Sequence, residues 1–221
     1  GAHYTSLAQI RAALGLTPGA RLDLVTLRTS TLATRLRALP AVDAAATDAA
    51  EVRVALPGRL IVTIHERRPI VVWQVGPRGL LVDSGGRLFA EADGAARPAL
   101  PAVADQRATA LALAVGDALD PLAFSAVRKL AAVTPALLGS TAPSLALALT
   151  DADGFTLAAP AGWRAVFGLY TTTIRPPSII DRQVQCLTSL LAQVGERNLA
   201  TIYLSPGAGA CGTYTTRKGT S

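Results

Sequence analysis

Two neighbouring segments in which apolar and polar residues alternate constrain the fold more than any other feature of the sequence. In residues 51–56, valine and leucine occupy every second position, and in residues 60–65 leucine, valine and isoleucine do so. The dipeptide Pro57-Gly58 between the segments favours a turn. Because alternate side chains of a strand point to opposite faces, the pattern predicts a β-hairpin with one apolar face.

Two helical segments precede this hairpin. Ser6 can cap a helix over residues 7–14, and Gly15 stands where helices commonly end in a left-handed residue. Leucines at helical spacing then predict a second helix that ends before Pro40. The two helices can cover the apolar face of the hairpin. We therefore expect a compact two-layer first domain over residues 1–68.

The pattern changes after this first domain. Short apolar segments separated by glycine-rich turns predict strands, and Pro121 can occupy the first turn of a helix. The expected strands are residues 70–75, 79–82, 87–90, 144–149, 155–158 and 163–169. A mixed or antiparallel sheet with flanking helices is therefore expected over residues 69–205, and the fold class of the whole chain is α+β.

The clearest amphipathic segment lies near the C-terminus. Apolar residues keep helical spacing over residues 180–194, and Ser178 with Asp181 resembles a capping box at the start of that helix. Residues 199–205 then alternate as a final strand. Beyond it the chain is rich in glycine, which predicts a flexible tail over residues 206–221.

The composition disfavours a nucleic-acid partner. Half of the residues are apolar, which suits a buried core, whereas aromatic residues make up only 5%. Few rings are therefore available to stack on bases. The net charge of +6 comes mainly from arginines that are scattered along the sequence, so it forms no continuous basic segment.

No segment of the sequence predicts a membrane helix. The longest apolar runs fall far short of the ~20 residues that cross a bilayer. The first residues, from Gly1 to Tyr4, lack the pattern of a signal peptide, and the sequence contains no methionine. We therefore expect any membrane anchor to precede Gly1.

Two short patterns suggest ligand sites but lack the context that such sites need. Gly207, Gly209 and Gly212 have the spacing of a dinucleotide-binding motif, yet no helical pattern follows them. Asp151 and Asp153 resemble the start of a calcium loop without its remaining ligands, so a hairpin turn is the better interpretation. We therefore predict no cofactor.

Catalytic and metal-binding residues are sparse as well. His3 and His65 are far apart in sequence, and neither lies at metal-ligand spacing from a cysteine or carboxylate. Cys186 has only these two histidines as candidate bases. We therefore predict neither a metal site nor enzymatic activity.

The two cysteines leave one question open. The final strand, running back along the last helix, would pass Cys186 before the chain reaches Cys211, which favours a disulfide. However, Cys186 lies about 120° from the apolar stripe of that helix, by the helical period of 3.6 residues. The sequence permits both a bonded and a free pair.

Six segments of the sequence follow one another in an informative order. They are Ile10-Arg11-Ala12-Ala13-Leu14-Gly15-Leu16, Leu36-Arg37-Ala38-Leu39-Pro40, Leu56-Pro57-Gly58, Ile64-His65-Glu66-Arg67-Arg68-Pro69, Trp73 and Leu81-Val82-Asp83-Ser84-Gly85-Gly86. Together they resemble the FtsQ/DivIB family of bacterial cell-division proteins, and the strand that ends in Glu-Arg-x-Pro is the most specific of them. The resemblance implies a POTRA domain followed by a β domain that ends in a long helix and a final strand.

The sequence departs from the family pattern in two places. A POTRA domain has the order strand, helix, helix, strand, strand, so the resemblance implies a first strand before Gly1. Residues 43–50 look like an insertion between the second helix and the hairpin.

The resemblance also implies a function. Proteins of this family are held in the cytoplasmic membrane by one N-terminal helix, with the remainder on the extracytoplasmic side. They are non-enzymatic scaffolds of the divisome in septum formation. The implied partners are bitopic proteins of the FtsB and FtsL type, with other division proteins at the POTRA domain.

An unpaired edge of the final strand would accept a partner strand by β-augmentation. The expected partner-binding residues are Ala200, Thr201, Ile202, Tyr203, Leu204 and Ser205. The side chains of Thr201 and Tyr203 would face outward. The alternative is that this strand is paired on both sides inside the sheet.

Two other classes of protein remain open at this point. POTRA domains also occur in outer-membrane assembly and secretion factors, where they hand substrate strands to a barrel. An exported enzyme is the third class, because a site assembled from distant residues leaves no local pattern in a sequence.

Overall fold

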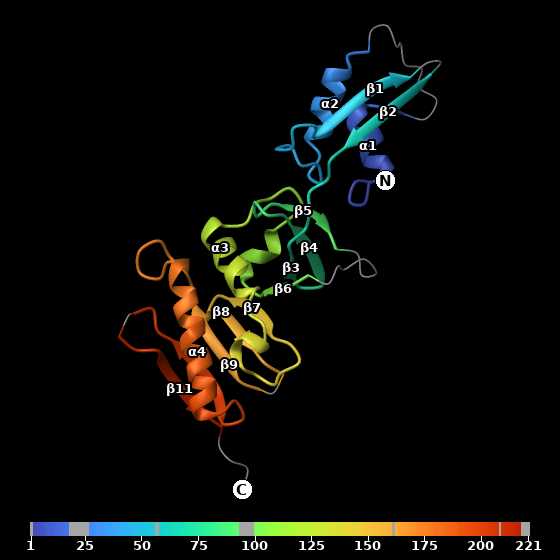
Figure 1. Cartoon of the computed structure of the whole chain (residues 1–221). Helices are drawn as coiled ribbons and strands as arrows, with labels where there is room; N and C mark the ends of the chain where they lie inside the picture. The colour runs from blue at the N-terminus through green and yellow to red at the C-terminus, as the bar shows by residue number, and fades with distance from the viewer. Residues whose placement is uncertain are drawn as a thin grey trace.

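The computed structural model describes residues 2–17, 27–55, 58–92, 100–160, 162–207 and 209–217. Within these ranges the chain has the expected α+β fold, with a two-stranded and a nine-stranded sheet. Figure 1 shows the two-stranded sheet and its helices at one end of an elongated molecule, with the larger sheet at the other. None of the described helices is long and apolar enough to cross a membrane.

Local sequence signals determine the first helix, α1 (Leu7–Leu14). The Ser6 hydroxyl accepts a hydrogen bond from the Gln9 backbone N–H at 3.2 Å, and the Gln9 side chain accepts one from the Ser6 N–H at 2.7 Å. Gly15 ends the helix with a φ of 69°, a left-handed conformation that glycine adopts at little cost. The predicted start and end of this helix are confirmed.

The second helix packs on the predicted hairpin. The elements are α2 (Thr29–Arg37), β1 (Ala50–Ala55) and β2 (Arg59–Ile64), and the two strands are antiparallel. The buried residues between these elements and α1 are Leu14, Leu32, Ala33, Leu36, Ala50 and Val52. The predicted helix-helix-hairpin order is confirmed, whereas Pro57 of the predicted turn lies outside the described residues.

The remaining strands form one mixed sheet in the order β11-β10-β9-β8-β7-β6-β3-β4-β5. Their bounds are β3 (Val71–Val75), β4 (Arg78–Val82), β5 (Leu88–Glu91), β6 (Ala102–Asp105), β7 (Ala146–Thr150), β8 (Gly154–Ala158), β9 (Arg164–Gly168), β10 (Leu199–Leu204) and β11 (Gly212–Thr216). Strand β6 was not expected from the sequence. It pairs in parallel with both β3 and β7, so it joins the two halves of the sheet.

Two helices pack on this sheet. α3 (Pro121–Leu130) has Pro121 in its first turn, as predicted, and Asp120 caps it by accepting a hydrogen bond from the Ala123 N–H at 2.8 Å. α4 (Ile180–Val194) packs against β9 and β10. The large side chains of the shared core include Trp73, Phe124, Leu130, Phe155, Trp163, Phe167, Leu187 and Leu191.

The capping box predicted for α4 is wrong. The residue before the helix is Ile179, and no side chain caps the N-terminus. A 3₁₀ turn, Pro177–Ile179, occupies this segment, so Ser178 lies inside a turn instead of at the helix boundary. Asp181 instead forms an ion pair with Lys129 of α3, at 2.5 Å.

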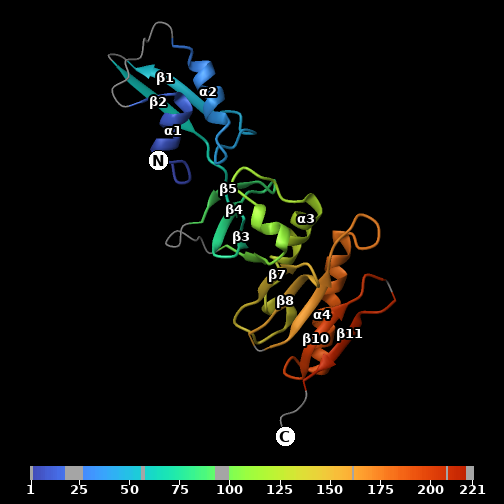
Figure 2. The same cartoon turned by 180° about the vertical axis from the view of Figure 1, so that it is seen from behind.

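The predicted flexible tail over residues 206–221 is wrong for its central part. Residues 212–216 form β11, which pairs antiparallel with β10. Threonine and tyrosine favour the extended conformation, and β10 supplies the backbone partners. Figure 2 shows β10 and β11 side by side at the end of the sheet farthest from the N-terminal unit. The second domain therefore continues through β11 and does not end at residue 205.

Candidate functional site

The strand expected to bind a partner is paired on both sides. β10 lies between β9, to which it is parallel, and β11, to which it is antiparallel. The prediction that residues 200–205 form an unpaired edge is therefore wrong, and the interior alternative holds. The reason is β11, which pairs with this side of β10. The glycine-rich sequence before β11 gave no sign of a further strand.

The side chains of β10 alternate as predicted only over residues 202–204, because a register shift lies between Leu199 and Thr201, and Ala200 is half-buried like Thr201. Leu199, Ile202 and Leu204 are buried in the core. Tyr203 faces outward and is 46% exposed, and Thr201 is half-buried. Of the predicted contact set, Tyr203 keeps an accessible side chain, while the backbone groups of the strand are used within the sheet.

The open edge of the large sheet is β11. Its neighbour in the described part of the chain is β10 alone, and Thr213, Tyr214, Thr215 and Thr216 are all exposed. Every second N–H and C=O of such a strand points away from the sheet. Backbone donors and acceptors are thus available in a row along β11.

The opposite edge of the sheet is partly covered. The Leu88 N–H of β5 donates to Asp117 O at 2.9 Å, and the Gly116 N–H donates to Leu88 O at 2.7 Å. Arg87 forms an additional bridge with Ala118. Because β5 has only four residues, this cover leaves too short a stretch to pair with a further strand.

Two tyrosines flank the open edge on opposite faces. Tyr214 of β11 lies opposite Ile202, whereas Tyr203 lies opposite Thr213. Directly opposed residues of an antiparallel pair point to the same face, so Tyr214 is on the α4 side of the sheet and Tyr203 on the other. Tyr214 is 45% exposed. A strand added beside β11 would have an aromatic side chain near each of its faces.

Gly212 is required where β11 begins. Its φ is 136°, and a Cβ atom there would lie 2.0 Å from the carbonyl oxygen of Tyr203. The last glycine of the G-x-G-x-x-G pattern therefore permits close pairing of two strands. In the described residues that follow it, the chain forms β11 and no helix.

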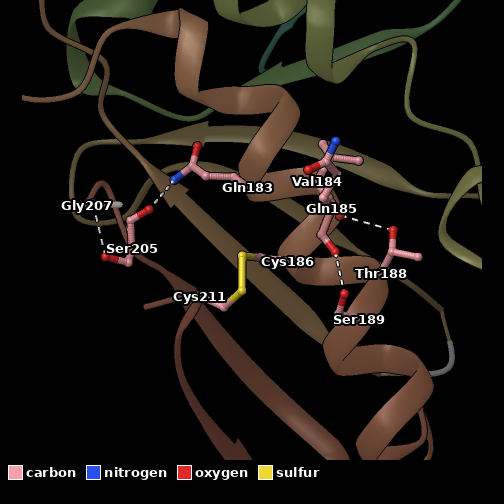
Figure 3. Close-up of a disulfide and its surroundings, with 9 residues drawn as sticks. All are labelled: Gln183, Val184, Gln185, Cys186, Thr188, Ser189, Ser205, Gly207 and Cys211. Atoms are coloured by element: carbon pink, nitrogen blue, oxygen red, sulfur yellow. Dashed lines mark hydrogen bonds between the residues drawn. A yellow bond between two sulfur atoms is a disulfide. The ribbon is translucent and has the colours of Figure 1, made fainter. Parts of the chain in front are cut away.

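The disulfide that the sequence left open is formed. Cys186 of α4 is bonded to Cys211, which directly precedes β11. Figure 3 shows the bond spanning the space between the helix and the start of the strand. Cys186 is buried although it lies off the predicted apolar stripe, because the β10–β11 end of the sheet covers that side of α4.

A buried amide fixes the neighbouring end of β10. Gln183 of α4 is buried, and its Nε2 donates to Phe167 O at 3.3 Å and to Ser205 O at 3.5 Å. The Tyr170 hydroxyl donates to Gln183 Oε1 at 2.8 Å. These bonds hold the ends of β9 and β10 against the helix.

The aspartates of the possible calcium loop have structural partners. Asp151 accepts a hydrogen bond from the Ala108 N–H at 2.9 Å, and Asp153 forms an ion pair with Arg164 at 2.8 Å. Both lie in the turn between β7 and β8, so the predicted hairpin turn is confirmed. Among the described residues, no group of three or more His, Cys, Asp or Glu side chains could hold a metal ion.

In the Glu-Arg pair of the most specific motif, Glu66 binds the N-terminal segment of its own unit, whereas Arg67 contacts the sheet domain. The Glu66 carboxylate accepts hydrogen bonds from the His3 N–H at 2.6 Å and the Tyr4 N–H at 2.9 Å. Burial raises the pKa of Glu66, but these hydrogen bonds outweigh it and hold the pKa below its ordinary value. Arg67 forms an ion pair with Asp83 in the turn between β4 and β5. Sequence reasoning did not predict these contacts.

Comparison with protein-family models finds no match to this sequence, and comparison with curated proteins finds none.

Proposed function

We propose that this chain is the extracytoplasmic part of an FtsQ/DivIB-type division protein, a non-enzymatic scaffold that recruits bitopic partners by accepting a strand at β11. The observation that carries the proposal is the contrast between the two edges of the large sheet. β11 presents its backbone to solvent, whereas Leu88 of β5 is covered by the segment around Gly116. An uncovered edge strand is a template for pairing with another chain.

The partner that fits this edge is an extended segment. Its backbone would continue the ladder of β11, and the affinity would come largely from main-chain hydrogen bonds. Selectivity would come from Tyr203 and Tyr214, because a tyrosine offers a large apolar surface and a hydroxyl at low cost in conformational entropy. The extracytoplasmic segments of FtsB- and FtsL-type proteins are the proposed partners.

The N-terminal unit supports the same family. Leu60, Val62 and Ile64 of β2 point towards the helices but are only half-buried, and no strand lies on the outer side of β2 among the described residues. A further strand beside β2 would cover these side chains. This is consistent with the first POTRA strand that the resemblance implies, and the POTRA unit is the proposed site for other division proteins.

Proline substitution along β11 tests the proposal. Neighbouring residues of a strand direct their N–H groups to opposite sides of the strand. Of the variants Thr213→Pro and Tyr214→Pro, one therefore removes a hydrogen-bond donor to the partner, and the other removes a donor to β10. Binding of the purified extracytoplasmic segment of an FtsB-type protein from the same organism is measured by calorimetry, together with thermal unfolding. We expect one variant to lose affinity at least tenfold at nearly unchanged Tm, and the other to lower Tm as well.

Leu111→Asp is the matched control, because Leu111 is an exposed residue of the large domain far along the chain from β11. It should bind as the wild type does. Wild-type affinity in both proline variants would refute recruitment at β11.

A further inference from the structure

β11 is attached to the protein by its backbone, by its two ends and by the Thr215 hydroxyl, which accepts a hydrogen bond from the Thr201 N–H at 3.2 Å. Its residues from Thr213 to Thr216 are all exposed, whereas Leu199, Ile202 and Leu204 of the neighbouring β10 are buried. Apolar burial is the main force that keeps a strand in place. The two ends of β11 must therefore supply the attachment that buried apolar side chains would otherwise provide.

The N-terminal end is held by the disulfide. Cys211 is bonded to Cys186, and Cys186 is next to Leu187, which is fully buried in the core. The Ser205 N–H donates to Cys211 O at 3.1 Å, while Ser205 itself is held by Gln183. Figure 3 shows the disulfide and the Gln183–Ser205 hydrogen bond on one side of α4. The start of β11 is thus tied to a helix that packs on the buried core of the domain.

The C-terminal end is held by Arg217. Its N–H donates to Asn198 O at 2.9 Å, and its Nε donates to Leu199 O at 3.2 Å. Each of these hydrogen bonds replaces hydrogen bonds to water in the unfolded chain, so its net contribution to stability is modest. The covalent bond at Cys211 is the stronger of the two attachments.

We infer that the Cys186–Cys211 disulfide acts as a redox switch on the partner-binding edge: the oxidised chain presents β11 in register, and the reduced chain releases it. This inference rests on the proposed function and names how that site is regulated. A dithiol reductant donates the two electrons. One of its thiolates attacks a cysteine sulfur, which breaks the S–S bond, releases the other cysteine as a thiolate and forms a mixed disulfide. The second thiolate of the reductant then attacks the reductant's own sulfur in that mixed disulfide and releases the remaining cysteine.

The products of that reaction are two cysteine thiols and the oxidised reductant. After reduction, the start of β11 is joined to the protein only through residues 206–210 and the ladder itself. The opposite reaction, in which a disulfide-bearing oxidase accepts the two electrons, restores the tether. Partner recruitment would then depend on completed oxidation of the exported chain.

Hydrogen exchange of the whole chain without any partner tests the tether itself. The oxidised wild type is compared with the same protein in dithiothreitol and with the Cys186→Ser/Cys211→Ser double variant. We expect the protected amides of residues 213–216 to exchange at least tenfold faster in both, while β8 keeps its protection. Ser189→Ala is the control, because its hydroxyl bonds only Gln185 O within α4, at 3.1 Å.

Binding of the FtsB-type segment is measured on the same samples, and reduction should lower the affinity at least tenfold. Unchanged exchange in residues 213–216 after reduction would overturn the inference, even if the serine variant fails to fold. Unchanged or increased affinity would overturn it as well, and an increase would mean that β11 shields β10. If the oxidised wild type binds no segment, the proposed function fails, whereas faster exchange on reduction would still support the tether.

Discussion

The guanidinium of Arg67 forms an ion pair with the carboxylate of Asp83, and both side chains are largely buried. Arg67 also donates from Nε to Pro40 O at 3.0 Å. Asp83 Oδ1 accepts hydrogen bonds from the N–H groups of Gly85 and Arg87, each at 2.9 Å. One ion pair therefore connects the segment that follows β2 with the Asp-Ser-Gly-Gly turn of the sheet domain.

Arg67→Met should lower the free energy of unfolding by about 3 kcal/mol, because it leaves the Asp83 carboxylate buried without its cation. Urea denaturation followed by tryptophan fluorescence measures the change. Arg53→Met is the control, since Arg53 pairs with Glu51 at an exposed surface, where solvent screening leaves such a pair little net effect on stability. Equal effects of the two substitutions would contradict a structural role for the Arg67–Asp83 pair.

Gly212→Ala should release the start of β11. The added methyl would collide with the Tyr203 carbonyl, and alanine tolerates a φ of 136° poorly. We expect faster hydrogen exchange in residues 213–216 and a loss of at least about 1 kcal/mol of stability. Gly209→Ala is the matched control, because no atom lies within 4 Å of the added methyl. Exchange at the wild-type rate in Gly212→Ala would show that β11 does not need this close approach.

Glu196 makes the stability depend on acid pH. Hydrogen bonds from the Ser140 hydroxyl and from the Thr141 hydroxyl and N–H lower the pKa of Glu196 to about 2. A carboxyl group with a lower pKa in the folded state stabilises the fold above its unfolded pKa of about 4.3, and this contribution is lost as the pH falls towards 2. Thermal unfolding of Glu196→Gln between pH 7 and 2 should show a smaller drop than the wild type. Parallel curves would exclude this role.

Asp105 should be the most sensitive position of β6. Its buried carboxylate accepts from Trp73 Nε1 at 3.0 Å and from Arg107 Nε and Nη2 at 2.9 and 2.7 Å. Asp105→Ala would leave the Arg107 cation and the indole N–H without their acceptor, at a cost of about 3–5 kcal/mol. Denaturant unfolding, followed by Trp73 emission, measures this loss of unfolding free energy. Asp117→Ala is the control, because the Asp117 carboxylate is exposed and accepts a hydrogen bond from the Ala114 N–H; it should cost about 1 kcal/mol. An equally small loss in Asp105→Ala would count against the buried network.

Elements with strong local signals were predictable. Ser6 and Gly15 bound α1 because capping acts within one helical turn. The alternation in β1 and β2 follows from one buried and one exposed face. The fold class and most strands of the large sheet could be derived from the same signals.

Elements that depend on distant partners were not predictable. β6 consists of four small residues whose extended form is imposed by β3 and β7 on either side. β11 follows a glycine-rich segment, and its pairing depends on β10. This hidden strand is the reason that the candidate site moved from residues 200–205 to residues 212–216.

The disulfide shows the same limit at a single residue. The helical period placed Cys186 off the apolar stripe of α4, but the buried side of the helix includes Gln183 and Cys186 and leaves Val184 and Val194 half-buried. The sheet end formed by β10 and Cys211 covers this side. Only the tertiary arrangement decides which residues of such a helix are enclosed.

The difference between the two edges of the nine-stranded sheet also limits how the protein can assemble. A sheet that is open at both ends can add copies without limit, whereas one that is blocked at β5 can be extended in one direction only. Each molecule therefore has a valency of one at this sheet. It can complete a pair with a single incoming strand, but it cannot propagate a fibre through it.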